Sequence, residues 1–341
     1  MPDEKTPEDV AALLSHTQLN RYKVFPQERR GGGNDLAARA VAPTRVRPGG
    51  EAAGAVPAVE SPALEFVRPA PRWSLLQELG SESDSPSLRG EPHDLRVPTL
   101  AVCSTGGGTG KTTVSATLGR ALSLAGENIL MIHGGLQPSA PLHFGAQPAQ
   151  AGRLRTFVPP LRNQGTVHML SHQFDDGTQA DEESGTWFIR EVNSLQGEID
   201  RCIVEISTAR GKEEPMLDLA RICLVVLTPD INSVMNLAPF RKLSERVNRS
   251  GPRQPLDVHF LINKFDPASA FHAEVRQNLR LQLGTRLLPF CIRRNDSITE
   301  ALAAGMTVLD YAPNSAPTED FQRLASWARE IASSQRSRGA V

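Results

Sequence analysis

The stretch C-S-T-G-G-G-T-G-K-T-T, from Cys103 to Thr113, follows an apolar run and opens an amphipathic one. Its glycines let several backbone N–H groups converge on one anion, and the N-terminus of a helix adds a partial positive charge. Lys111 supplies a point charge for terminal phosphates, and the Thr112 hydroxyl is a suitable ligand for Mg²⁺. The stretch therefore predicts a phosphate-binding loop, although Thr105 stands where the strict motif begins with glycine. The alternative is a glycine-rich turn that binds no nucleotide.

Apolar runs alternate with amphipathic stretches on both sides of this loop. The expected strands are Thr99–Cys103, Asn128–Ile132, Val167–Leu170, Cys202–Ile206, Cys223–Leu227, His259–Ile262 and Leu287–Cys291. The expected helices are Thr112–Ala125, Asn232–Asn248, Phe271–Leu283 and Pro317–Ala332. This alternation predicts an α/β fold of the P-loop NTPase type, with a mostly parallel twisted sheet covered by helices on both faces. Ligands in such folds bind beyond the carboxyl ends of the strands.

The first 94 residues differ in composition from the rest. They hold 11 of the 26 prolines, so we expect a largely disordered tail, followed by a nucleotide-binding domain over residues 95–335 and a disordered C-terminus over 336–341. Two segments of the tail, residues 8–25 and 73–79, carry leucine and aromatic anchors. They are predicted to dock on a partner or, alternatively, to pack on their own domain.

Charge and cysteine content limit the possible partners and the location. The net charge is −1, which gives no strong field toward nucleic acid or anionic lipid. There is no apolar run of about 18 residues and no signal-peptide pattern, so we expect a cytoplasmic protein without direct membrane insertion. The four cysteines lie far apart within apolar runs, which indicates buried thiols and neither disulfides nor a metal site. They are Cys103, Cys202, Cys223 and Cys291.

The loop and the stretch A-L-S-L-A-G-E-N-I-L-M-I that follows it resemble the deviant Walker A ATPases of the MinD/ParA group. The segment F-L-I-N-K-F looks like the one whose asparagine reads adenine in that group, which points to Asn263. The run from Ile292 to Ser315 is similar to the group's closing segment. The resemblance implies a homodimer that binds ATP and Mg²⁺. The residues that would contact the nucleotide are Gly106, Gly107, Gly108, Thr109, Gly110, Lys111, Thr112, Thr113 and Asn263.

Within that group, three features resemble the family of cellulose-synthase-operon ATPase-like proteins, BcsQ. They are G-E-N-I-L-M-I, then P-L-H-F-G at 141–145, and L-L-P-F-C-I-R-R-N-D at 287–296. This resemblance implies a nucleotide-responsive dimer that assembles or positions a cellulose secretion machine. Partners would recruit it to the inner membrane, and small proteins of the secretion system would meet its N-terminal tail.

The chain departs from the group's pattern at the positions that matter for turnover. The signature lysine, which crosses to the other subunit's nucleotide, falls at Gly106. The acidic D-x-D pair falls at His133 and Gly135, and the Walker B aspartate is Glu205, which would reach Mg²⁺ through a water. These departures imply slow or absent hydrolysis and weak ATP-dependent dimerisation. Arg210 is a candidate compensating cation, with a solvated side chain as the alternative.

Three functions stay open from the sequence. The first is an ATP-binding switch with feeble hydrolysis, which the retained Gly110, Lys111 and Thr112 favour. The second is a pseudo-ATPase scaffold, and the third is a partition-type positioning ATPase on DNA. The basic stretch 240–253 suits DNA phosphates, but a solvated helix face explains it equally simply, and nucleic acid is not the expected partner. His133 has two possible roles: a general base for hydrolysis, or a hydrogen-bonded structural residue at the end of a strand.

Overall fold

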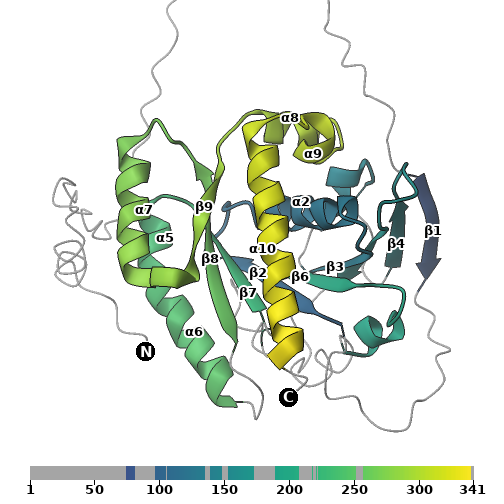
Figure 1. Ribbon diagram of the computed structural model, residues 1–341, viewed down its shortest axis with the longest axis horizontal. Coiled ribbons are helices and arrows are strands. Elements are labelled where there is room, and N and C mark those ends of the chain that lie inside the picture. Colours follow the sequence, from purple (N-terminus) through teal and green to yellow (C-terminus); the bar gives the residue numbers. More distant parts are fainter. Residues whose placement is uncertain are drawn as a thin grey trace, which may run out of the picture. The chain divides into compact units, whose positions relative to one another are not determined.

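The computed structural model describes residues 74–80, 97–104, 106–134, 139–147, 153–172, 189–206, 217, 220, 222–250 and 256–338. Together these residues form three layers, a sheet between two sets of helices (Figure 1). This confirms the expected α/β fold. The predicted docking segment at residues 8–25 and the predicted disorder of the tail's first 73 residues lie outside the described chain.

The middle layer is a nine-stranded sheet in the order β1-β4-β5-β3-β6-β2-β7-β8-β9. Its strands are β1 Ser74–Gly80, β2 Thr99–Ser104, β3 Ile129–Gly134, β4 Arg153–Val158, β5 Val167–His172, β6 Arg201–Glu205, β7 Ile222–Leu227, β8 Asp257–Phe265 and β9 Leu287–Arg293. The strands from β5 across to β9 run parallel, and β4 pairs antiparallel with both of its neighbours. All seven expected strands are present, and β2, which leads into the phosphate loop, lies in the interior of the parallel part.

Helices lie on both faces of the sheet (Figure 1). They are α2 Lys111–Leu124, α5 Ile231–Met235, α6 Leu237–Ser250, α7 Ala270–Leu283, α8 Ser297–Ala303, α9 Val308–Tyr311 and α10 Ala316–Arg338, with 3₁₀ turns η1 Ala140–Phe144 and η2 Gly284–Arg286. Residues 189–194 are also helical. Among the described helices, none has the length and apolar content that a membrane span requires.

Two apolar cores, one on each face, hold the layers together. Along β2, Leu100 and Val102 point to one core while Ala101 and Cys103 point to the other, because successive side chains of a strand alternate between faces. The first core packs against α2 and α10, and the second packs against α5, α6 and α7. Strands buried on both faces are apolar at every position, which is why the sequence shows them as continuous runs.

Beyond β5 the sheet has two strands that were not predicted, β4 and β1. The segment 73–79 was expected to dock on a partner or to pack on its own domain, and Ser74–Gly80 forms β1 and pairs antiparallel with β4. Of the two alternatives for this segment, the structure shows the one in which it packs on its own domain. Ser74–Gly80 is thus part of the sheet, although it precedes residue 95, where the domain was expected to begin. Neither β1 nor β4 was predicted, because both strands mix polar residues with apolar ones; β1 is the edge strand and β4 lies between β1 and β5.

Two helix boundaries also differ from expectation. The helix predicted over Asn232–Asn248 is split at Asn236 into α5 and α6. Pro239 explains the break, since its ring would clash with the carbonyl of residue 235 in a continuous helix, whereas proline is tolerated in a first turn. The last helix, α10, continues to Arg338, so three of the residues expected in a disordered C-terminus are helical.

A buried ion pair joins α2 to α9. Arg120 donates to both carboxylate oxygens of Asp310 at 2.8–3.1 Å, and the two side chains are 3% and 6% exposed. The guanidinium also donates to Gln164, and the Thr307 hydroxyl donates to Asp310. A buried pair is stable only when its remaining polar atoms have partners. This network fixes the helix that begins at the phosphate loop against the C-terminal part of the chain.

The four cysteines are buried and free, as the sequence predicted. Cys103 and Cys223 lie on the neighbouring strands β2 and β7, with their sulfur atoms 3.1 Å apart. Burial raises the pKa of the Cys291 thiol to about 11, so this thiol stays protonated at neutral pH. These thiols act as small apolar side chains of the core.

Candidate functional site

The phosphate loop joins β2 to α2 at the carboxyl edge of the sheet. Gly108 and Gly110 have φ values of 73° and 90°, a left-handed conformation that glycine adopts without strain. The Ser104 hydroxyl donates to the Gly106 carbonyl at 2.7 Å, which ties the start of the loop to the end of the strand. Gly110 caps α2, and the first turn of that helix holds no acidic residue that would oppose an anion.

The candidate metal ligands lie together. Thr112, in the first turn of α2, donates its hydroxyl to Glu205 Oε1 at 2.6 Å. Glu205 ends β6, next to Val102 in the register with β2, so the strand pairing carries its carboxylate to the loop. Burial raises the pKa of Glu205, and the Thr112 hydrogen bond and the Lys111 charge partly oppose that shift. A hydroxyl and a carboxylate at one point are the hard oxygen ligands that Mg²⁺ prefers, so these residues fit the ion.

His133 lies where the resemblance would have an aspartate, at the end of β3 between Ser171 and Glu205 in the register. Its side chain is 2% exposed. Its Nε2 is 3.4 Å from the Ser171 hydroxyl, and its Nδ1 has no hydrogen-bond partner among the described residues. Burial and, secondarily, the charge of Arg155 lower the pKa of His133 to about 4. The imidazole is therefore neutral at pH 7 and brings no negative charge to the site. Gly135 lies outside the described residues.

Acidification is expected to destabilise the fold through this histidine and His143. Burial lowers the pKa of each to about 4, from an ordinary value of 6.5. Between these values the unfolded chain binds more protons, so the free energy of unfolding falls as the pH drops below 6.5 and levels off below about 4. At pH 5 the loss should be about 2 kcal/mol per histidine.

Denaturant unfolding at pH 7.5 and pH 5 measures this effect. The variants His133→Gln and His143→Gln should each remove a share of the pH dependence, because glutamine does not titrate. Equal pH dependence in the wild type and both variants would contradict the assignment.

Asn263 and Lys264, at the end of β8, both contact the phosphate loop. The buried amide of Asn263 donates to the Thr109 carbonyl at 2.8 Å, and Lys264 Nζ donates to the Gly108 carbonyl at 2.7 Å. Asn263 was predicted as the residue that reads adenine. In this structure one of its amide protons is held by the loop itself. The contact of Lys264 was not predicted, since no local pattern indicates which loop a strand end will touch.

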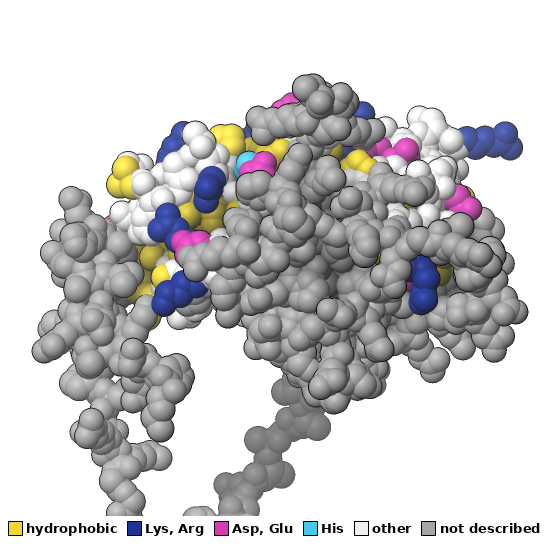
Figure 2. Space-filling view, turned by 90° about the horizontal axis from the view of Figure 1, so that it is seen from below, with side chains coloured by type: hydrophobic (Ala, Val, Ile, Leu, Met, Phe, Trp, Pro, Cys, Tyr) yellow, Lys and Arg dark blue, Asp and Glu magenta, His cyan; other side chains and the backbone are white. Residues whose placement is uncertain are grey.

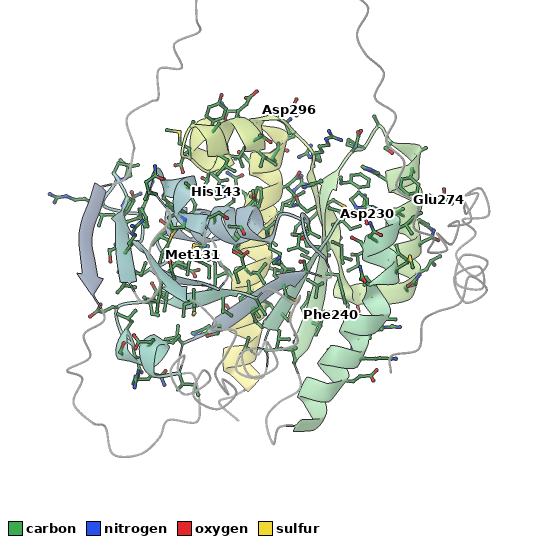
Figure 3. The ribbon with its side chains drawn as sticks, turned by 180° about the vertical axis from the view of Figure 1, so that it is seen from behind. Met131, His143, Asp230, Phe240, Glu274 and Asp296 are labelled. Atoms are coloured by element: carbon green, nitrogen blue, oxygen red, sulfur yellow. The ribbon has the colours of Figure 1, made fainter. Side chains whose placement is uncertain are left out.

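A cavity of about 530 Å³ adjoins the loop at the carboxyl edge. Figure 3 labels two residues of its lining, Asp230 and Asp296. Gly107, Gly108 and Lys264 line one side, and the other lining residues follow β7 and β9 or start α7: Thr228, Pro229, Asp230, His272, Arg293, Arg294, Asn295, Asp296, Ile298 and Thr299. The part after β9 falls in the predicted closing segment, whereas the part after β7 was missed. Its position after a parallel strand was the available signal.

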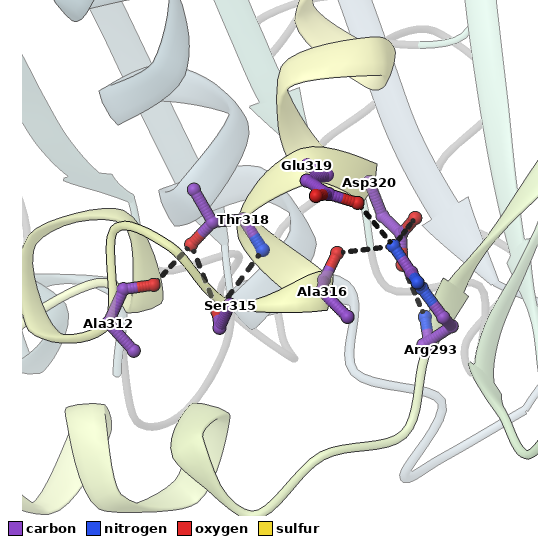
Figure 4. A network of polar contacts seen from close by, with 7 residues as sticks. All are labelled: Arg293, Ala312, Ser315, Ala316, Thr318, Glu319 and Asp320. Atoms are coloured by element: carbon purple, nitrogen blue, oxygen red, sulfur yellow. Dashed lines mark hydrogen bonds and ion pairs between the residues drawn. The ribbon is translucent and has the colours of Figure 1, made fainter.

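Hydrogen bonds and ion pairs within the chain fix two residues of the cavity lining, Asp230 and Arg293. Asp230 caps α5 by accepting from Ser233 N, and it also accepts from the Thr228 hydroxyl. Arg293 is bound by the N-terminal turn of α10, where it donates to Asp320, Glu319 and the Ala316 carbonyl (Figure 4). The segments that follow β7 and β9 are therefore fixed where they leave the sheet. The charge of Arg293 is compensated by the carboxylates of α10.

The basic helix α6 has a mixed surface. Arg241 and Lys242 are exposed on it. Seen from below, the Lys and Arg side chains on the α6 and α7 side lie among acidic and apolar ones (Figure 2). In the described part of this face, cations thus lie beside acidic and apolar side chains. Arg210, the candidate compensating cation, lies outside the described residues. The described residues hold no group of three or more His, Cys, Asp or Glu side chains that could bind a metal ion.

A family model described as the CobQ/CobB/MinD/ParA nucleotide binding domain matches residues 100–308. The match runs from β2 through α8 to the start of α9, and thus includes the phosphate loop, Glu205, Asn263 and most of the cavity.

The curated relatives that match most of the chain share about a quarter of its residues. The cellulose biosynthesis protein BcsQ of Salmonella typhimurium is 25% identical over 236 residues, which cover 65% of this chain and 90% of that protein. The chromosome partitioning protein ParA of Caulobacter vibrioides is 24% identical over 271 residues, or 71% and 96% of the two chains. Two BcsQ proteins of Escherichia coli are 37% identical over 73 residues, which span 21% of this chain and only 30% and 29% of theirs.

Solved structures share the fold. MinD of Pyrococcus horikoshii, complexed with Mg-ADP, has a TM-score of 0.52 at 18% identity, covering 69% of this chain and 97% of that one. MinD of Aquifex aeolicus has a TM-score of 0.53 at 15% identity, with the same coverage. The ATP complex of Cyanothece McdA(D38A) has a TM-score of 0.52 at 17% identity, covering 67% and 96%.

Proposed function

The chain belongs to the family of CobQ/CobB/MinD/ParA nucleotide-binding domains, and from that premise we propose that it is an ATP-binding, dimerising switch with weak or no hydrolysis. One observation supports this most strongly. The phosphate loop runs into α2 at Lys111, and the Thr112 hydroxyl meets Glu205 at 2.6 Å. An anion site and an oxygen-ligand pair thus lie side by side, as bound ATP and Mg²⁺ require.

In this proposal, the N–H groups of the loop and the first turn of α2 bind the phosphates. Lys111 would neutralise the terminal phosphates, and the Thr112 hydroxyl and the Glu205 carboxylate, the latter through a water, would hold Mg²⁺. The bound Mg²⁺ supplies positive charge to the phosphate oxygens. The cavity beside Gly107 and Gly108 is large enough for the nucleoside.

The dimer is proposed to be weakly ATP-dependent. Gly106 has no side chain to extend to a partner's nucleotide, and each such charge-assisted contact is worth about 1.5–3 kcal/mol. A Cβ at Gly106 would meet no atom within 4 Å, so a side chain can begin there without a clash. Sedimentation of the wild type and Gly106→Lys with a non-hydrolysable ATP analogue should show the tighter dimer in the variant.

Hydrolysis is expected to be far slower than the rate of about 1 s⁻¹ that is typical of competent enzymes. Attack by water needs an acceptor that orients it, and a neutral His133 with its lowered pKa carries no carboxylate charge there. Phosphate release should therefore be close to background in the wild type. The double variant His133→Asp/Gly135→Asp should raise it, and adding Lys111→Ala should abolish the gain.

Wild-type turnover near 1 s⁻¹ would show that the site has another water-orienting group. The pseudo-ATPase alternative makes a different prediction, because a scaffold with a vestigial site would not respond to ATP in any of these variants.

For the cellular role, we propose assembly or localisation of a cellulose synthesis and secretion complex. The features shared with BcsQ and the match to the Salmonella protein over 65% of the chain support this role. The protein would act in the cytoplasm and reach the inner membrane through small partner proteins, some of them bound by the N-terminal tail. Two observations would support this role: cellulose synthase genes next to the gene of this protein, and loss of cellulose when that gene is deleted.

A partition-type role is the competing proposal, because ParA of Caulobacter is equally similar. It requires DNA binding by surfaces such as α6 and repeated turnover. Intact cellulose with defective DNA segregation in the same deletion would favour it instead.

A further inference from the structure

Two consecutive residues of β8 hold two consecutive carbonyls of the phosphate loop. Asn263 Nδ2 donates to the Thr109 carbonyl at 2.8 Å, and Lys264 Nζ donates to the Gly108 carbonyl at 2.7 Å. The Asn263 contact is buried and the Lys264 contact is exposed. The loop's outer turn is therefore held by a strand that comes more than 150 residues later in the chain.

Lys264 has an unusual backbone for a residue with a side chain. Its φ is 56°, and it is the sole non-glycine with positive φ in the described part of the chain. Left-handed backbone costs such a residue about 1 kcal/mol or more, so its neighbours must enforce it. Glycine would end the strand here without this strain. The presence of a lysine instead indicates that its side chain contributes an interaction.

The loop itself provides little that could replace this contact. A Cβ placed at Gly106, Gly107 or Gly108 would meet no atom within 4 Å, so no described group packs against the loop on the side to which these Cβ atoms would point. Flexible glycines lose the most entropy when they are fixed, and a loop that is already fixed binds its ligand more tightly. Contacts with the loop carbonyls are therefore well placed to influence nucleotide affinity.

Two other basic side chains that line the cavity, Arg293 and His272, have partners away from the phosphate loop. Arg293 is bound by Asp320 and Glu319 of α10. His272 Nδ1 accepts from the backbone N–H of Asp266. Lys264 is the lysine whose ammonium lies on the loop from outside, beside Gly108 and with its Cε 3.9 Å from the Cβ position of Gly110.

We propose that Lys264 is a positioning residue for nucleotide binding. Its ammonium fixes the outer turn of the phosphate loop in the anion-binding conformation, together with Asn263. It also gives the loop a second cation from the same chain, on the outer side where Gly106 provides none. The ligand in this inference is the ATP of the proposed function, but the effect on the loop is present without any ligand.

The test compares Lys264→Gly and Lys264→Arg with the wild type, using exposed Lys242→Ala on α6 as the control. Glycine adopts the positive φ without strain and has no ammonium. A loss in Lys264→Gly therefore comes from the missing side chain and not from a strained backbone. Amide exchange of the peptide covering residues 104–113 is measured without nucleotide, and the Kd for ATP with Mg²⁺ is measured by titration.

In Lys264→Gly, loop exchange should be faster and ATP binding weaker, each by about tenfold, as expected for the loss of one hydrogen bond from a charged donor. Lys264→Arg should stay within about twofold of the wild type, because its guanidinium can donate to the same carbonyl. Wild-type exchange and affinity in Lys264→Gly would overturn the inference. Absence of ATP binding in the wild type would overturn the proposed function alone, because the exchange measurement still decides the role of Lys264.

Discussion

Asp310→Ala is expected to lower the free energy of unfolding by about 3–5 kcal/mol, because it leaves the Arg120 guanidinium charged and buried without its partner. Arg120 is 3% exposed and donates to both oxygens of Asp310. For a domain of this size, that loss corresponds to a fall in Tm of roughly 6–20 °C. Thermal unfolding followed by circular dichroism measures it.

Two variants control for this prediction. Glu274→Ala removes an exposed carboxylate from α7 and should change stability by less than about 0.5 kcal/mol. Arg120→Met/Asp310→Leu replaces the whole pair with apolar side chains and should recover much of the loss. If Asp310→Ala behaves like Glu274→Ala, the pair does not anchor α2 against α9.

Gly110→Ala is expected to weaken ATP binding by roughly 30- to 150-fold, or about 2–3 kcal/mol. A left-handed backbone costs alanine about 1–2 kcal/mol, and Gly110 has a φ of 90°. The new Cβ would also lie 2.5 Å from Asn263 Nδ2, so the hydrogen bond from Asn263 to the Thr109 carbonyl has to break. Titration with ATP and Mg²⁺ measures the change.

Gly197→Ala is the matched control outside the loop. Gly197 has a φ of 94° and a Cβ there would meet nothing within 4 Å, so alanine brings the same backbone strain and ATP affinity should change by less than about threefold. Equal losses of ATP affinity in the two variants would mean that the contact with Asn263 is not the cause.

The sequence predicted the interior of the fold well and its edges poorly. Strands such as β7, with every residue buried, leave a continuous apolar run that is easy to recognise. The strand β4, R-L-R-T-F-V, which lies next to the edge strand β1, mixes arginines with apolar residues and looks like a loop. The break at Asn236 was missed because the apolar spacing continues across it, while the proline that causes it stands three residues later.

The candidate site was predictable where it is local in sequence. Lys111 and Thr112 belong to one motif, and Glu205 was identified from the resemblance, as the residue at the position of the Walker B aspartate. The contacts that connect them are not local. Thr112 and Glu205 are 93 residues apart, and Lys264 and Gly108 are 156 apart. Such pairs depend on strand order, and periodicity alone does not determine which strands become neighbours.

Thermal unfolding with ATP and Mg²⁺, in the wild type and in Lys111→Ala, tests most directly whether this loop holds a nucleotide. At a hundredfold excess over Kd, a ligand that binds only the folded protein stabilises it by about 2.7 kcal/mol, so the Tm of the wild type should rise clearly. The Lys111→Ala variant should fold normally and show little or no rise. An unchanged Tm in the wild type, or an equal rise in both proteins, would contradict the account.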